Sequence, residues 1–99
     1  MAVGDVFEDF SANVANGDYL SVQPAAGYQA VVHNLFWAGS VELYNQEGAN
    51  QILYRTPAAG AGGDAFYAYH VTNTHYIRIK NISGGAIHLA FDGVYTKEP

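Results

Sequence analysis

Apolar and polar residues alternate in short runs along almost the whole chain, and glycine, proline or asparagine separates one run from the next. A period of two is typical of a β-strand that buries one face, whereas an amphipathic helix repeats every 3.6 residues. About eight such runs follow one another, spaced by roughly 8 to 12 residues, with no helical segment between them. The pattern predicts an all-β protein, and more narrowly an antiparallel β-sandwich or barrel.

A jelly roll is the arrangement that we prefer for these strands. The dipeptide Asn16-Gly17 is favoured in two-residue hairpin turns, so we expect the first two strands to pair with each other and a meander to follow. The glycine-rich segment 58–64 is expected to be a mobile loop, and Gly93 to mark a bulge. The expected strands span residues 10–15, 18–23, 28–37, 41–44, 51–56, 65–71, 75–80 and 87–96.

Some of these strands have one clearly apolar face. Leu20 and Val22 alternate with polar residues, as do Ile77 and Ile79 further along the chain. The strand at 28–37 differs, because both of its phases carry apolar side chains. We therefore expect both faces of this strand to be partly covered.

The length of the chain, 99 residues, allows one domain with a single small core, so we expect one β-sandwich over residues 1–99. The chain contains no cysteine, so a disulfide framework cannot supplement that core. With 49% hydrophobic and only 13% charged residues, the chain has more apolar surface than a lone soluble domain usually keeps. We therefore expect a homo-oligomer, since self-association hides such surface.

The first nine residues form a separate question. Val3, Val6 and Phe7 lie among acidic residues with no turn signal to fold the segment back, so we expect a short N-terminal arm at 1–9 that docks on a partner. The alternative is that this stretch is simply the first edge strand of the sandwich. A helical stripe through the same apolar positions is a further reading, which Gly4 and the short length make unfavourable.

Charge and hydropathy argue against several classes of partner. The formal net charge of -5 repels phosphate backbones, so we expect no nucleic-acid partner. No stretch approaches the roughly 20 apolar residues of a membrane span, and the start of the chain lacks a signal-peptide pattern. We expect a soluble, unexported protein with no membrane partner.

No catalytic motif is present, so we predict that the protein is not an enzyme and uses no cofactor or metal. The four histidines (His33, His70, His75 and His88) lie on different expected strands or strand ends, and none forms a His-x-His pair. The serines lack a Gly-x-Ser-x-Gly elbow. Surface or hydrogen-bonded histidines are the simpler interpretation.

Aromatic residues, 14% of the chain, are the more informative feature. Exposed rings can stack on sugars or anchor a protein interface, and the simpler interpretation is that they pack between the sheets. The candidates for stacking are Trp37, Tyr44, Tyr54, Tyr67, Tyr69 and Tyr76. The candidates for a protein interface are Val3, Val6, Phe7, Phe10, Phe36, Trp37, Tyr67 and Tyr69.

Strand and turn phrases across nearly the whole chain resemble those of small all-β structural proteins of tailed bacteriophages. The phrases are MAVGDV at residues 1–6, QPAAGY at 23–28, VHNL at 32–35, VELY at 41–44, HVTN at 70–73, YIRIKNIS at 76–83 and FDGV at 91–94. No active-site signature is among them, so the resemblance transfers no functional residue.

This resemblance implies a virion component, made in the host cytoplasm. The role implied is a head decoration or cement protein of jelly-roll type that binds the major capsid protein, and in that class the assembly is a trimer. The alternative is a carbohydrate- or receptor-binding module of a phage tail or tail tip.

Overall fold

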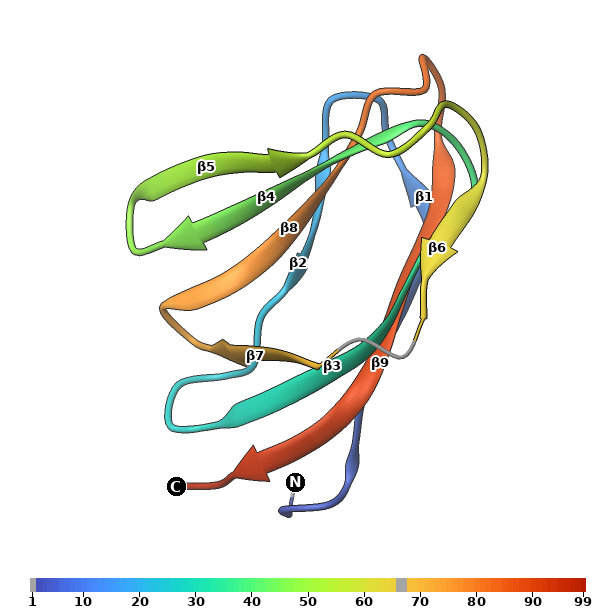
Figure 1. Ribbon diagram of the computed structural model, residues 1–99. Helices are drawn as coiled ribbons and strands as arrows, with labels where there is room; N and C mark the ends of the chain where they lie inside the picture. The colour runs from blue at the N-terminus through green and yellow to red at the C-terminus, as the bar shows by residue number, and fades with distance from the viewer. Residues whose placement is uncertain (1, 66–67) are drawn as a thin grey trace.

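The computed structural model describes residues 2–65 and 68–99, and these form nine β-strands and no helix (Figure 1). The described part accordingly holds no helix that is long and apolar enough to cross a membrane. The strands are β1 (Val6–Val14), β2 (Tyr19–Val22), β3 (Gln29–Trp37), β4 (Val41–Glu47), β5 (Asn50–Arg55), β6 (Gly62–Asp64), β7 (Tyr69–Thr72), β8 (His75–Asn81) and β9 (Ile87–Lys97).

The strands form two antiparallel sheets that pack as a sandwich, which confirms the all-β prediction (Figure 1). The β9 sheet has the order β1-β9-β3-β6, and β7 also pairs with β3. The β8 sheet has the order β2-β8-β4-β5. Every connection is a crossover between the sheets except β4 to β5 and β6 to β7, so sequence neighbours rarely pair.

The core lies between the two sheets and contains the residues with the clearest alternation. Leu20, Val22, Ile77 and Ile79 are all buried there, as their alternation predicts. The other apolar residues of this core are Phe7, Val14, Ala30, Val32, Leu35, Trp37, Val41, Leu43, Val71, Leu89, Phe91 and Tyr95. Hydrophobic burial along both sheets therefore stabilises the sandwich.

The hairpin predicted at Asn16-Gly17 is wrong. β1 pairs with β9, and β2 pairs with β8. The turn is instead attached to the end of β8: Gly17 N donates to the Asn81 carbonyl (2.8 Å), and Asn81 N donates to the Asp18 carbonyl (2.9 Å). A turn-forming dipeptide thus carries the chain from one sheet to the other.

The predicted meander is wrong except for one hairpin. β4 and β5 pair through the turn at Gly48, whose φ of 58° suits glycine. The segment 58–64 is not wholly a loop, because β6 pairs with β3. A Cβ on Gly63 would lie 2.6 Å from the Leu35 carbonyl oxygen, so this glycine permits close strand contact rather than mobility.

The irregularity expected at Gly93 exists, but the extra residue is on β3. Val32 pairs with Gly93 and Asn34 pairs with Asp92, which leaves His33 as the bulged residue. The bulge switches the buried phase of β3, from Ala30 and Val32 before it to Leu35 and Trp37 after it. This switch explains why neither simple phase of residues 28–37 describes the buried face.

The N-terminal segment corresponds to the edge-strand alternative over most of its length. β1 begins at Val6, pairs with β9, and places Phe7 in the core. Before it, Gly4 N donates to the Tyr95 carbonyl (2.8 Å), and Tyr95 N donates to the Asp5 carbonyl (3.0 Å). Residues 6–9 therefore belong to the sandwich and not to a free arm, and the helical reading is wrong.

Candidate functional site on the outward face of the β9 sheet

The predicted interface residues separate into buried and exposed groups. Phe7 and Trp37 are each only 5% exposed and belong to the core, so they are not surface anchors. Tyr69 is half-buried, packs against the core and lies 5.9 Å from the ring of Tyr54. Tyr67 lies outside the described residues. The exposed group consists of Val3, Val6, Phe10 and Phe36.

Phe10 and Phe36 lie in one row across three strands of the β9 sheet. Phe10 on β1 and Phe36 on β3 both pair with Ala90 on the central strand β9. The two phenylalanines are 69% and 45% exposed. Two large rings therefore stand on either side of a methyl group on the outward face of the sheet.

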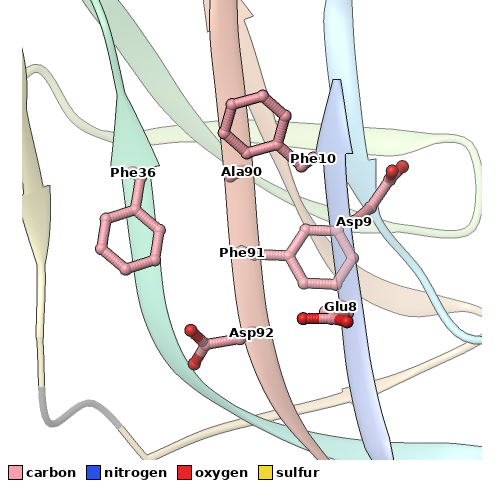
Figure 2. Close-up of a pocket in the computed structure, with 7 residues that line it drawn as sticks. All are labelled: Glu8, Asp9, Phe10, Phe36, Ala90, Phe91 and Asp92. Carbon is pink, nitrogen blue, oxygen red and sulfur yellow. The ribbon is translucent and has the colours of Figure 1, made fainter. Parts of the chain in front are cut away.

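A hollow of about 660 Å³ lies at this row, lined by Glu8, Asp9, Phe10, Phe36, Ala90, Phe91 and Asp92 (Figure 2). A second hollow of about 350 Å³ shares Phe10, Phe36 and Ala90 with it and extends past His88 toward Ala38, Ala61 and Gly62. Ala90 lines both hollows and is itself only 7% exposed.

The next row of the same face is acidic. Glu8 on β1 pairs with Asp92 on β9, and Asp92 pairs with Asn34 on β3. Asn34 Nδ2 donates to Asp92 Oδ1 at 2.6 Å. Like charges directly opposite each other on neighbouring strands are generally destabilising, and Glu8 and Asp92 occupy such a pair of positions.

A third row, Val6-Val94-Val31, completes the apolar part of this surface beyond the acidic pair. At the other end, the His88 ring lies 5.4 Å from the Phe10 ring. We call the outward surface of these rows of β1, β9 and β3 the open face.

The four histidines do not converge. His88 contacts Phe10, His70 Nε2 lies 3.1 Å from Gln29 Oε1, and His75 Nδ1 lies 3.6 Å from Glu47 Oε2. Within residues 2–65 and 68–99, no group of three or more His, Asp or Glu side chains is arranged to hold a metal ion.

The outward surface of β2, β8 and β4, which we call the closed face, also carries rings and charges. The guanidinium carbon of Arg78 lies 3.7 Å from the centre of the Tyr19 ring, and Lys80 Nζ lies 5.8 Å from it. Tyr44 Oη donates to Glu42 Oε1 at 2.8 Å. This hydrogen bond is the main reason that the pKa of Tyr44 is raised to about 12. Burial and the negative charge of Glu42 act on the pKa in the same direction.

The Asn-Ile-Ser triplet at 81–83 matches a glycosylation acceptor, but Asn81 is completely buried. Its Nδ2 donates to the carbonyls of Val14 (2.8 Å) and Gly85 (2.6 Å), and its Oδ1 accepts from Ser83 N (2.8 Å). This amide joins β8 to the end of β1 and to the turn before β9, so its role is structural.

Five lining residues of the larger hollow were not among the predicted interface residues: Glu8, Asp9, Ala90, Phe91 and Asp92. Of these, Glu8, Ala90 and Asp92 share the outward phase of a strand with a histidine or phenylalanine, which is the signal that the sequence contains. That signal becomes useful only when β1, β9 and β3 are known to be neighbours, and their pairing is not local in sequence.

Comparison with known proteins leaves the site to be interpreted from its geometry. No protein-family model matches the chain, and no curated protein matches its sequence.

Proposed function

We propose that this protein is a non-enzymatic structural protein of a bacteriophage virion, a decoration or cement protein that binds the assembled capsid. We further propose that its sandwich is a jelly roll. If β6 and β7 are counted as one interrupted strand, the sheets have the orders 1-8-3-6 and 2-7-4-5, which match those of an eight-stranded jelly roll. This architecture is common in viral capsid proteins and in lectins.

The open face is the observation that carries the proposal. It combines exposed Phe10 and Phe36 with the acidic side chains of Glu8 and Asp92 around one hollow. Interfaces are typically built on aromatic anchors with charged groups that select the partner. A protein partner with a basic, partly apolar surface would complement this face, and in this proposal that partner is the major capsid protein.

The proposed mechanism involves no chemistry. A protein that binds the assembled lattice and not the dissociated subunits shifts the assembly equilibrium by RT ln(1 + [L]/Kd). At a concentration of about 100 times Kd, the shift is roughly 2.7 kcal/mol for each site. Many sites on one capsid would then add together, and a homotrimer, the preferred oligomer, would engage several capsid subunits at once.

A sedimentation experiment tests this function. Purified protein is mixed with expanded heads of the encoding phage that lack it, and separately with dissociated capsid subunits. We expect saturable binding to the heads only, with a higher temperature of head disruption. Heads that bind none of the protein would contradict the proposal.

The alternative, a carbohydrate- or receptor-binding module of a phage tail, has one supporting observation. The larger hollow places aromatic rings beside carboxylates, which can stack on sugar rings and accept hydrogen bonds from hydroxyl groups. Trp37 cannot serve this purpose in the folded chain because it is buried. A glycan array with the wild-type protein separates the two functions, since a decoration protein should retain no glycan.

A further inference from the structure

We propose that the hollow between Phe10 and Phe36 receives one cationic side chain, an arginine or a lysine, from the protein partner. The aliphatic stem would lie over Ala90, and the charged group would reach Glu8 and Asp92. This inference takes the identity of the partner from the proposed function, but the site itself depends only on the open face.

The spacing of the rings suits a single side chain. β1 and β3 are the two neighbours of β9, so their backbones lie about 10 Å apart, twice the usual distance between paired strands. Phe10 and Phe36 stand at the same level on these strands, and the gap that they line is the hollow, which also contacts the largely covered Ala90 (7% exposed). A stem of methylene groups can fill that gap, and a cation near the ring faces gains a cation–π contact.

The site is negatively charged, so a cation would complement it. Glu8 and Asp92 are paired across the strands, and the described chain supplies no basic side chain to either of them. Arg55 binds Asp64 at the edge of the sandwich, and Arg78 and Lys80 lie over Tyr19 on the closed face. A guanidinium or ammonium group between the carboxylates would replace repulsion by charge-assisted hydrogen bonds.

Two other occupants fit the observations less well. A second copy docked through the same face would bring its own Glu8 and Asp92 against this pair, because a two-fold contact places identical surfaces together. A divalent metal ion is disfavoured because, in the described chain, no group of three or more His, Asp or Glu side chains is arranged to hold one. A basic side chain from a different protein is the occupant that the geometry and the charge favour together.

The first test uses peptide probes and needs no capsid. The isotope-labelled protein is titrated with acetyl-Gly-Arg-Gly-amide, and with the same peptide carrying citrulline, which has the shape of arginine without its charge. We expect shifts in the NMR signals of β1, β9 and β3 around the hollow, with a Kd of roughly 1 to 10 mM, and no binding of the citrulline peptide. Equal binding of both peptides, or shifts on the closed face, would overturn the inference. So would calcium ions that bind the same residues more tightly than the arginine peptide.

The second test uses head binding with matched variants. The pair Glu8→Gln and Asp92→Asn removes the site charges, whereas the pair Asp18→Asn and Glu98→Gln removes the same amount of charge from exposed residues elsewhere. Ala90→Leu fills the gap without a change in charge. We expect the first pair and Ala90→Leu to weaken head binding at least tenfold and the control pair to change it less than twofold, with thermal unfolding verifying the fold.

The outcomes of the two tests separate the inference from the function. Wild-type protein that binds heads, together with site variants that bind equally well, would overturn the inference and leave the function standing. Wild-type protein that binds no heads would contradict the function, and the peptide titration would still decide whether the hollow accepts a cationic side chain.

Discussion

The two outward faces of the sandwich differ in the contacts that the chain itself provides to their aromatic and charged side chains. On the closed face, Arg78 lies over the Tyr19 ring and Tyr44 donates to Glu42. On the open face, Glu8 stands opposite another acid, Asp92. Asn34 donates a hydrogen bond to Asp92 on the open face, but among the described residues only the closed face has an arginine and a lysine over one of its rings.

This difference indicates which face of a small sandwich is the better candidate for a binding surface. Aromatic and acidic residues alone do not distinguish the faces, because each face carries both. What distinguishes them is whether the chain itself provides the counter-charge. A partner that supplies the missing counter-charge binds such a face favourably. A face whose charged groups already have contacts within the chain would first have to lose those contacts.

We expect the largest loss of folding stability from a substitution at Gly93, in the sheet that carries the open face. A Cβ at position 93 would clash with the Val31 carbonyl oxygen and lie 2.9 Å from Val32 Cα. Gly93→Ala should therefore lower the free energy of unfolding by about 3 kcal/mol or more, measured by urea denaturation. Gly85→Ala is the control, since a Cβ there meets nothing within 4 Å, and it should change stability by less than about 0.5 kcal/mol. Equal stabilities of the two variants would show that the β3 bulge tolerates a side chain.

The next effect concerns the link between the two sheets. Asn81→Ala removes three side-chain hydrogen bonds of a completely buried residue and leaves the Val14 and Gly85 carbonyls without this donor. We expect a loss of about 2 to 4 kcal/mol in thermal or chemical unfolding. Asn13→Ala, at an exposed position on β1, should stay within about 0.5 kcal/mol of the wild type. A mild Asn81 variant would mean that water replaces the amide.

A pH titration tests the closed face. Glu42→Ala removes the acceptor of the Tyr44 hydroxyl, so the pKa of Tyr44 should fall from about 12 toward its ordinary value of 10. Because the folded pKa is the raised one, the wild type should lose stability as pH rises from 10 to about 12, and the variant should lose less. Tyrosine ring NMR can follow Tyr44 among the eight tyrosines. Glu8→Ala, on the open face, should leave this titration unchanged, and a shift there would contradict the independence of the two faces.

The smallest change in stability that we expect is a gain and not a loss. Glu8→Gln removes one of two opposed carboxylates, so it should raise the free energy of unfolding by about 0.5 kcal/mol at low salt. The gain should shrink at about 1 M salt, where charges on the surface are screened. A stability loss in this variant would indicate that Glu8 already has a favourable partner within the chain.

The sequence could predict parts of the fold whose signal is local. Leu20, Val22, Ile77 and Ile79 were expected on buried faces and are buried, because one side of each strand is apolar and the other polar. The β4–β5 hairpin was also local, since its turn glycine closes two adjacent runs. Nothing local distinguishes such a hairpin from the turn at Gly17, which connects the two sheets instead.

The candidate site was only partly predictable for the same reason. Phe10 and Phe36 are exposed interface candidates, as expected, but Phe7 and Trp37 are in the core. Along β1, Phe7 and Phe10 differ only in phase, and the register with β9 decides which of them faces inward.

By itself, the sequence determined that this chain forms β-structure with one small core, because alternation and turn residues act over a few neighbouring positions. Only the tertiary structure decided which side of β3 is buried, since both phases of that strand are apolar and the bulge at His33 exchanges them beside Gly93. It also placed Glu8 against Asp92 and Phe10 level with Phe36, although these residues come from opposite ends and the middle of the chain. Strand pairing is set by hydrogen bonds and burial across the whole sandwich, and no local pattern contains that information.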